Sequence, residues 1–575
     1  MHRLWTFASA AAVLAGAAMI TGSAAANPTN PQSQTGNTVR DQVRQLLEST
    51  PGQIVSPMAR VALENFALGG DPHDPQSARE SAHRTPHGLV GSDPIQSQAV
   101  TTDGPAPATA GLPNVRVNDP AEDSHFVDQT TQSETALAVA GSDLVVGFND
   151  SQQSLVSFTG ADLNLSGVAA SHDGGQTFTD GGVLPNAPGY LNLGDPWLTS
   201  SGGAFYYSTL MSDYRGAFNI SVGVSRSTDG GRSWGEPVNA SLGLEQANLF
   251  QLSLGDKPAM VSTTSGLYVA WDDFTLHRSL YGYVWFNGLA VAHSTDGGKT
   301  WTASYASNRS LFDNGAGYGC GRTVIGAQPV VSPDGTVYVA AEQVGFCGRN
   351  GKTHDTMAVF ASNDGGATWT QPGELPITSV TQGFGQFFLG PGRYMRSMEF
   401  PTLTAFRRNL YMAWNDAGDG SGHSHIEVAT SGNGGHSWTT SYITSGNNDE
   451  VQPSVTVDGS GVHILYYELS GARPACAFSL GCGGTVGSAQ LDVLVSNSSD
   501  GSSWTARRVT TTSFPGVITL PQFDTAIAWT YMGDYIASVT DGVHQYFAWG
   551  DNRDIVTNWV WPQGRHDPDV FFARQ

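Results

Sequence analysis

Short apolar runs alternate with glycine-rich polar segments from about residue 111 to the end of the 575-residue chain. Each unit opens with a polar residue, usually followed by proline, and continues as an apolar run, a glycine turn and a run rich in tyrosine or tryptophan. Runs of this length, bounded by Gly, Pro, Asn and Asp, predict β-strands. The units open at seven positions: Glu134, Asp195, Asp256, Gln328, Glu399, Gln452 and Asp534. The pattern therefore predicts an all-β domain of repeated units over residues 111–575.

A second, shorter repeat reads Ser-x-Asp-Gly-Gly-x-Thr-Trp with small variations, and its six copies start at Ser171, Ser227, Ser294, Ser362, Ser431 and Ser498. Successive starts are 56, 67, 68, 69 and 67 residues apart, which is room for about four short strands in each unit. In a tight hairpin the carboxylate holds backbone amides and the glycines adopt positive φ, so we expect these loops to be structural. We expect the fifth and sixth loops to be looser, because Asn433 replaces the aspartate and the loop of Asp500 is one residue shorter.

This repeat resembles the Asp-box, or BNR repeat, of the sialidase superfamily, and it recurs through residues 171–504. The resemblance implies a single β-propeller. Seven unit openings against six loops favour seven four-stranded blades, and six blades are the alternative. The last blade would use Asp534–Val539, Val543–Trp549 and Pro568–Ala573, and an N-terminal strand from Asn114–Asn118 would close it.

Composition and charge restrict the partners of the chain. Asp and Glu outnumber Lys and Arg by 50 to 27, so nucleic acid is excluded as an expected partner. Residues 1–26 have the pattern of a secretory signal peptide, which predicts a secreted protein. Residues 27–110 are rich in Pro, Ser and Gln and predict a spacer or propeptide with short helices. No later stretch is long and apolar enough to span a membrane, and we expect a monomer.

Four cysteines occur in the chain, and export makes disulfides possible. Four cysteines allow three pairings. Their local grouping predicts the pairs Cys320–Cys347 and Cys476–Cys482.

Polar residues are expected to gather on the propeller face opposite the six hairpin loops. That face would receive the openings of the units and the turns after each second strand, such as Asn149-Asp150 and Asp272-Asp273. Carboxylates around one funnel would recognise sugar hydroxyls and supply acid and base groups for glycoside hydrolysis. The alternative is that these side chains cap strand ends and fix turns.

The resemblance to sialidases also implies roles for particular residues. That family uses a Tyr nucleophile with a Glu, an Asp acid/base, and arginines around the substrate carboxylate. Its Arg-Ile-Pro motif is absent here, so the resemblance implies a sialidase-like hydrolase with its own variation of the site. The expected catalytic residues are Tyr535, Glu399 and Asp272. The expected substrate-binding residues are Arg393, Arg396, Arg553, Asp195, Asp256, Gln328, Gln452 and Trp285.

One Gly-rich loop gathers Asp416, Asp419, His423 and His425. Carboxylate and carbonyl oxygens suit calcium, and imidazoles suit zinc. We consider Asp416 and Asp419 as calcium ligands, with a solvated turn as the alternative, and no other cofactor is expected.

The leading hypothesis is a secreted, sialidase-like glycoside hydrolase that acts on an acidic or complex glycan. The first alternative is a polysaccharide lyase on a uronate-containing glycan. The second is a non-catalytic propeller that binds glycan or protein.

Overall fold

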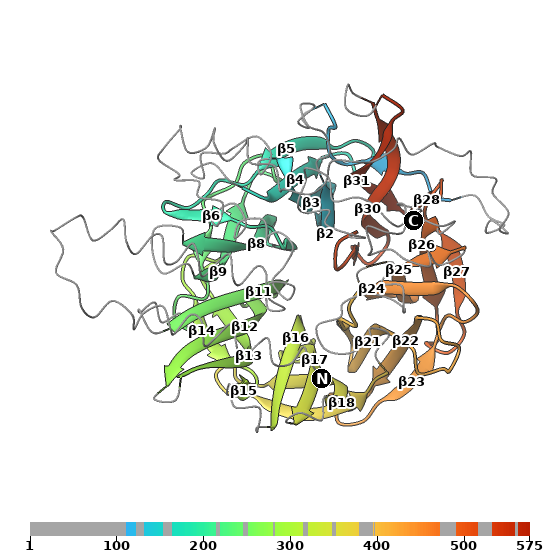
Figure 1. The fold of residues 1–575 in the computed structure, drawn as a ribbon. Helices are drawn as coiled ribbons and strands as arrows, with labels where there is room; N and C mark the ends of the chain where they lie inside the picture. The colour runs from blue at the N-terminus through green and yellow to red at the C-terminus, as the bar shows by residue number, and fades with distance from the viewer. Residues whose placement is uncertain are drawn as a thin grey trace, which may run out of the picture.

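A computed structural model of the chain describes residues 111–121, 131–152, 164–213, 219–244, 251–279, 282–313, 320–347, 352–378, 395, 397–471, 490–515, 532–557 and 562–575. The predicted signal peptide and the predicted spacer of residues 27–110 lie outside these ranges. The elements within them are β-strands, as the sequence pattern predicts. Figure 1 shows the sheets following one another in chain order around a common centre, with β2, β11, β16 and β24 nearest to it.

Most sheets are antiparallel and follow the order of the chain. The first contains β2 (Gln132–Ala140), β3 (Asp143–Asp150), β4 (Ser166–Ser171) and β5 (Thr179–Val183). Two further sheets contain β16 (Cys320–Val331), β17 (Val337–Cys347), β18 (Lys352–Ser362) and β19 (Thr370–Pro376), and then β20 (Thr402–Phe406), β21 (Asn409–Asp416), β22 (His425–Ser431) and β23 (Thr439–Tyr442). A five-stranded sheet contains β24 (Asp449–Asp458), β25 (Gly461–Ser470), β26 (Gln490–Ser498), β27 (Thr505–Arg508) and β28 (Phe514–Pro515).

A ten-stranded sheet departs from this size. Its first half contains β6 (Tyr190–Asn192), β7 (Trp197–Ser201), β8 (Ala204–Asp213), β9 (Ile220–Ser227) and β10 (Val238–Asn239). Its second half contains β11 (Gln251–Ser262), β12 (Leu267–Ser279), β13 (Gly282–Ser294), β14 (Thr302–Tyr305) and β15 (Ser310–Asp313). The halves are joined by one parallel pair, Leu254 of β11 with Ile220 of β9. Each half otherwise has the antiparallel order of the other sheets.

The two ends of the described chain share a sheet of β1 (Val115–Arg116), β31 (Arg565–Arg574), β30 (Gln545–Val556) and β29 (Ala537–Thr540). Val115 of β1 is paired with Phe572 of β31, the pairing expected for residues 114–118. Asn118 extends it, because its Nδ2 donates to Asp569 Oδ1 at 2.7 Å and its Oδ1 accepts the backbone N–H of Val570 at 2.9 Å.

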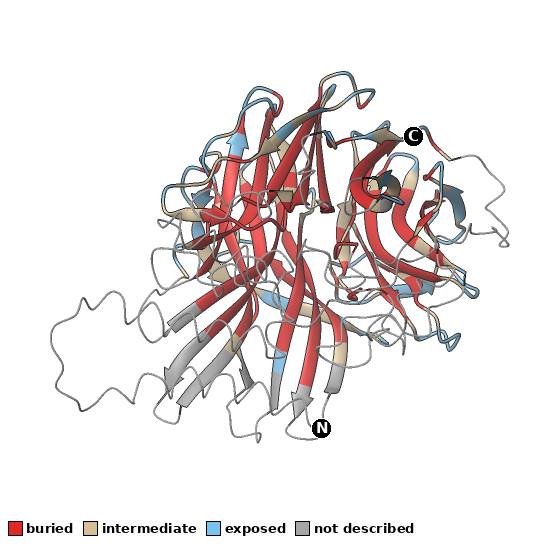
Figure 2. Cartoon of the chain, turned by 45° about the horizontal axis from the view of Figure 1, so that its top comes forward, coloured by how far each residue is buried: buried red, intermediate tan, exposed pale blue. Residues whose placement is uncertain are grey.

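Apolar side chains form clusters between neighbouring groups of strands, and Figure 2 shows burial along the strands and exposure at many of the loops that join them. Val146 of β3 shares a cluster with Phe572 of β31. Trp549 of β30 shares another with Leu465 of β25. The last group of strands therefore packs against both the preceding group and the first one. Burial of large rings at these positions is the main stabilising contribution.

The repeated hairpin loops join the third and fourth strands of each group. In the second loop Asp229 Oδ1 accepts the backbone N–H of Ser233 at 3.0 Å, and Oδ2 accepts the hydroxyl of Ser233 at 2.6 Å. These hydrogen bonds lower the pKa of Asp229 to about 2. The fifth loop keeps the arrangement: Asn433 Oδ1 accepts the N–H of Ser437 at 3.0 Å, and Asn433 Nδ2 donates to Ser437 Oγ at 2.8 Å. The expectation of a looser fifth loop is wrong, because an amide replaces the carboxylate with its donor turned toward the hydroxyl.

The sixth loop differs at its tryptophan. Asp500 Oδ1 still accepts the N–H of Ser503 at 2.9 Å. In a full-length loop the indole closes the turn, as where Trp301 Nε1 donates to Gly298 O at 3.1 Å. Among the described residues, buried Trp504 Nε1 has no hydrogen-bond partner. The missing residue therefore leaves the carboxylate contact intact and removes the indole contact.

The strand register places the backbone of Cys320 opposite that of Cys347. Antiparallel partners lie about 4.5–5.5 Å apart between Cα atoms, which is within the range of a disulfide. This disulfide stays a prediction. Cys476 and Cys482 lie outside the described residues.

A search of the described residues finds no helix with the length and apolar character that crossing a bilayer requires.

Candidate functional site

Residues that are far apart in the sequence meet where the inner strands begin. Lys257 Nζ lies 2.6 Å from Asp534 Oδ2 and 3.9 Å from Asp195 Oδ2. The backbone N–H of Asp534 donates to Glu134 Oε1 at 3.1 Å. Lys257 also lies 5.4 Å from the centre of the Phe400 ring. The openings of five units therefore lie close to one ammonium group.

The openings of a sixth and a seventh unit are attached to these residues by hydrogen bonds between side chains and backbone groups. Gln452 Nε2 donates to Gly533 O at 2.7 Å. The backbone N–H of Gly326, beside predicted Gln328, donates to Asp272 Oδ2 at 2.8 Å. We name Glu134, Asp195, Asp256, Lys257, Asp272 and Asp534 the central cluster. All six side chains are buried.

A left-handed backbone conformation recurs at these openings. The φ angles are 50° at Glu134, 54° at Asp195, 47° at Lys257 and 53° at Gln452. Three of these positions lie at β-bulges, where the strand register shifts. Such a conformation costs on the order of 1–3 kcal/mol in a residue other than glycine. Bulges re-aim side chains, and the strain therefore lies at the openings of the units, including three residues of the central cluster.

Asp256 and Asp272 are cross-strand partners in β11 and β12. Burial is the main cause that raises the pKa of Asp256 to about 7, and the neighbouring carboxylates of Asp272, Asp534 and Glu134 raise it further against the effect of Lys257. Burial also raises the pKa of Asp272 to about 7. Both carboxyl groups therefore change protonation near neutral pH, which is where acid/base catalysis is most effective.

Asp272 and Asp256 differ in their hydrogen bonds. Asp272 accepts the N–H of Gly326 at 2.8 Å and that of Ala327 at 3.3 Å, so it holds the opening of the next unit. Asn149 has the same role two units earlier, since its Oδ1 accepts the N–H of Asp195 at 2.8 Å. Asp256 is 4% exposed, and neither of its carboxylate oxygens has a hydrogen-bond partner among the described residues. Asp256 therefore differs from Asp272 in having no hydrogen bond that fixes its carboxyl group.

Tyr535 and Glu399, the other expected catalytic residues, lie next to the cluster. Tyr535 is half-buried, and its hydroxyl donates to Pro196 O at 2.9 Å. Its ring lies 5.8 Å from that of Trp197. Glu399 is buried immediately before Phe400. The pair of aromatic rings offers a surface on which a sugar ring can stack.

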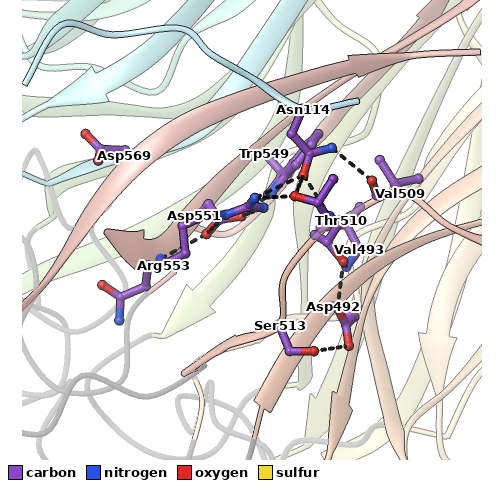
Figure 3. A network of polar contacts seen from close by, with 12 residues as sticks. Asn114, Asp492, Val493, Val509, Thr510, Ser513, Trp549, Asp551, Arg553 and Asp569 are labelled. Atoms are coloured by element: carbon purple, nitrogen blue, oxygen red, sulfur yellow. Dashed lines mark hydrogen bonds and ion pairs between the residues drawn. The ribbon is translucent and has the colours of Figure 1, made fainter. Parts of the chain in front are cut away.

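Arg553 binds within the protein, as Figure 3 shows. Its Nε donates to Asp551 Oδ1 at 2.9 Å, and its Nη1 donates to Asn114 Oδ1 at 3.0 Å. Asn114 Nδ2 in turn donates to Val509 O at 2.9 Å. The guanidinium also stacks on Phe571 at 4.3 Å. These contacts give Arg553 a structural role between the last strands and the N-terminal segment, because the fork is engaged by protein groups.

The side chains of three other predicted substrate-binding residues lie outside the described structure. Arg393 and Arg396 lie outside the described residues. For Trp285 of β13 the described structure covers the backbone alone.

The predicted metal loop is held by hydrogen bonds. Asp416 Oδ2 accepts the N–H of Thr378 at 2.7 Å, and its Oδ1 accepts the hydroxyl of Tyr442 at 2.6 Å. Asp419 Oδ2 lies 2.5 Å from His425 Nδ1. Over the ranges that the structure covers, no group of three or more His, Cys, Asp and Glu residues could hold a metal ion. Asp416 and Asp419 therefore have protein partners in the described structure, and calcium binding by them stays a prediction beside the alternative of a solvated turn.

Lys257 was not among the predicted site residues. A signal was available, since the chain contains three lysines and one of them directly follows Asp256. Lys257 stands between an acidic residue and a proline at the opening of a predicted inner strand. A lysine in this position can form an ion pair inside the protein. Trp197 was also missed, although it follows Asp195 by two positions.

No model of a known protein family matches the chain, and no curated protein matches it. Solved structures similar to it include the Hadza microbial sialidase Hz136, with 17% identity over 58% of this chain and 63% of that chain, and a TM-score of 0.37. The GH93 α-L-arabinofuranosidase of Fusarium graminearum in complex with arabinobiose shows 13% identity over 63% and 94%, with a TM-score of 0.38. The phage phi92 endosialidase shows 11% identity over 81% and 69%, with a TM-score of 0.40. The chain spans less than two thirds of the Hz136 sialidase.

Proposed function

We propose that the chain is a secreted glycoside hydrolase whose reaction takes place at the central cluster of a seven-bladed propeller. Each half of the ten-stranded sheet would be one blade, and β1 would complete the last blade. The observation that carries the proposed activity is Asp256, a buried carboxyl group with no hydrogen-bond partner in the described structure, beside two carboxylates that form ion pairs with Lys257.

In this mechanism Asp256 is the general acid. Its pKa of about 7 keeps it protonated in a substantial fraction of molecules up to neutral pH, so it can donate a proton to the glycosidic oxygen. Lys257 lies 2.6 Å from Asp534 and stabilises its ionised form. Asp534 is thereby suited to act as the base or nucleophile that hydrolysis requires. Glu399 and Tyr535 stand beside these groups, and Asp272 positions the neighbouring unit.

Export follows from the predicted signal peptide of residues 1–26, and the segment 27–110 is proposed as a spacer. The protein is proposed to act as a monomer without a metal ion.

The first test is the variant Asp256→Asn. Loss of a general acid lowers kcat by roughly 10²–10⁴-fold, measured as release of reducing ends from a panel of glycans. The matched control is Asp334→Asn, which changes an exposed aspartate in the turn between β16 and β17. Equal activity of the wild type and Asp256→Asn would contradict the assignment.

The same variant has an independent stability readout. A raised pKa in the folded state means that the stabilising contribution of Asp256 is complete below about pH 4 and is lost as the pH rises through about 7. Asn cannot ionise, so Asp256→Asn should unfold at a higher temperature than the wild type at pH 8, and the difference should shrink toward pH 5.

The alternatives predict different products. A polysaccharide lyase would generate an unsaturated sugar that absorbs ultraviolet light, whereas hydrolysis would not. A binding module would bind glycans without turnover. In that case Asp256→Asn would change the affinity for the glycan.

A further inference from the structure

Asn149 uses both ends of its side-chain amide beside the central cluster. It lies near the end of β3, and its side chain is fully buried. Its Oδ1 accepts the backbone N–H of Asp195 at 2.8 Å, and its Nδ2 donates to Glu134 Oε2 at 2.9 Å. The other oxygen of Glu134, Oε1, accepts the backbone N–H of Asp534 at 3.1 Å. One amide and one carboxylate therefore connect the backbone N–H groups of two aspartates.

The two connected aspartates are those that form ion pairs with Lys257. The Nζ atom of Lys257 lies 2.6 Å from Asp534 Oδ2 and 3.9 Å from Asp195 Oδ2. These aspartates belong to units that are far apart in the sequence. Because the connection through Asn149 and Glu134 holds the backbone of both, it determines where their carboxylates lie around the ammonium group.

The residue before each of these aspartates is a glycine that leaves room for the connection. Gly194 has a φ of 83°, and a Cβ atom added to it would lie 2.3 Å from Asn149 Oδ1. Gly533 has a φ of 91°, and a Cβ atom added to it would lie 2.8 Å from the backbone nitrogen of Glu134. Glycine adopts both φ values without strain. The backbone therefore approaches Asn149 and Glu134 more closely than a residue with a side chain would allow.

The connection needs an amide at position 149. The side chain there accepts an N–H group at one end and donates to a carboxylate at the other, and asparagine can do both. An ionised aspartate would also accept the N–H group, but its second oxygen would face Glu134 without a proton to donate. Asp272, two units later, accepts backbone N–H groups with both of its oxygens, from Gly326 and Ala327. The difference between the side chains at these two positions therefore matches the difference between their partners.

Resting on the proposed function, we infer that Asn149 is a positioning residue for hydrolysis, which acts through Glu134 to fix the aspartates around Lys257. Asp534 is the proposed base or nucleophile, and its reactivity depends on where its carboxylate lies relative to the ammonium group. A misplacement of about 1 Å can lower the rate of an enzyme by about 10²-fold. The expected effect of Asn149 is therefore on kcat.

The test reverses the polarity of the connection in the full-length protein. Asn149→Asp places two carboxylates face to face. Glu134→Gln is the second single variant, because its amide can satisfy only one of the two donors that Glu134 accepts. The double variant Glu134→Gln with Asn149→Asp keeps the total charge and restores the connection, since the amide at position 134 then donates to the carboxylate at position 149.

The matched control is Asn363→Asp, at an exposed position in the fourth hairpin loop. Asn363 Oδ1 accepts the hydroxyl of Thr336 at 2.9 Å, and a carboxylate can accept the same hydroxyl. The control therefore introduces the same change of charge without disturbing a hydrogen bond, and it should leave both readouts unchanged.

Two readouts are measured. The first is kcat and KM across pH, from the reducing ends released from the glycan that the wild type hydrolyses fastest. The second is the NMR signal of the Lys257 ammonium group after labelling of lysine with ¹⁵N, which needs no substrate. The chain contains three lysines, and the variants Lys299→Arg and Lys352→Arg identify the signals of the other two.

We expect Asn149→Asp to lower kcat by about 10²-fold with little change in KM, and to shift the Lys257 signal. The double variant should recover most of kcat and the signal of the wild type. The ratio of kcat in Asn149→Asp to kcat in the wild type should rise as the pH falls, because one of two facing carboxylates then takes up a proton and donates it as the amide did.

Unchanged kcat in both single variants would overturn the inference, whether or not the Lys257 signal shifts. A double variant that loses as much kcat as the single variants together would also overturn it. If Asn149→Asp does not fold, the comparison of Glu134→Gln with the double variant decides in the same way. The expected shifts of the signal, with no hydrolysis by the wild type, would support the positioning of the aspartates and remove the proposed catalytic activity.

Discussion

Lys257 shows how much of this site depends on one residue. Its ammonium group forms ion pairs with Asp195 and Asp534, from two other units that are distant in the sequence. The backbone of Lys257 has a left-handed conformation with φ of 47°. A buried ion pair contributes little net stability, but removal of one partner leaves an uncompensated charge. Lys257 is therefore required mainly because its neighbours are acidic.

We expect Lys257→Met to lower the free energy of unfolding by about 3–5 kcal/mol, measured by denaturant titration. The double variant Lys257→Met with Asp534→Asn should recover part of this loss, since one of the unpaired carboxylates is then absent. Additive losses in the double variant would show that the 2.6 Å pair does not couple the two residues.

At the scale of the element, the hairpin loops also depend on one polar side chain each. Each loop uses a short polar side chain to hold the backbone amides that the turn leaves without strand partners. The loop of Asn433 shows that the amide side chain closes the turn as well as the carboxylate does. The loop therefore requires a hydrogen-bond acceptor at this position. A negative charge on the acceptor strengthens the hydrogen bonds.

For the second loop we expect Asp229→Ala to lower the free energy of unfolding by about 1 kcal/mol, and Asp229→Asn to lower it by less. The folded-state pKa of about 2 lies below the ordinary value, so the contribution of Asp229 is present above about pH 4 and is lost as the pH falls toward 2. Urea titrations between pH 2 and 6 should therefore converge for the wild type and Asp229→Asn at the acid end. Parallel curves would contradict this.

At the scale of the whole molecule, the N-terminal segment connects the last two groups of strands. Asn118 binds Asp569 and Val570 of β31, and Asn114 binds Val509 and Arg553 (Figure 3). Short strands contribute few ladder bonds, so these two side chains provide much of the attachment of β1.

Replacement of Asn118 by Ala should cost about 2 kcal/mol, because it leaves buried Asp569 and the N–H of Val570 without this partner. Limited proteolysis should then cut near residues 111–121 faster than in the wild type. A control substitution, Ser265→Ala in an exposed turn, should leave that rate unchanged. Equal cleavage rates for all three proteins would show that β1 is held by its backbone pairing alone.

The sequence predicted the repeating units well, because apolar runs, glycine turns and the Ser-x-Asp loops are local signals. The meeting of Asp195, Asp256 and Asp534 also followed from placing the unit openings on one face. The roles within that face did not follow. Whether a carboxylate holds a backbone amide, as Asp272 does, or lacks such a contact, as Asp256 does, depends on the neighbouring unit. The partners of Arg553 and Asp416 did not follow from the sequence for the same reason, since they come from other parts of the chain.

The pairing of β1 with β31 also has a consequence for biosynthesis. Asn118 binds Val570, which lies 452 residues further along the chain. The strand β1 is therefore synthesised long before β31. Contacts of such separation form late and slowly. Until residues 565–574 have been synthesised, β1 has no β31 with which to pair, and we expect a chaperone that shields nascent chains to be needed most at this seam.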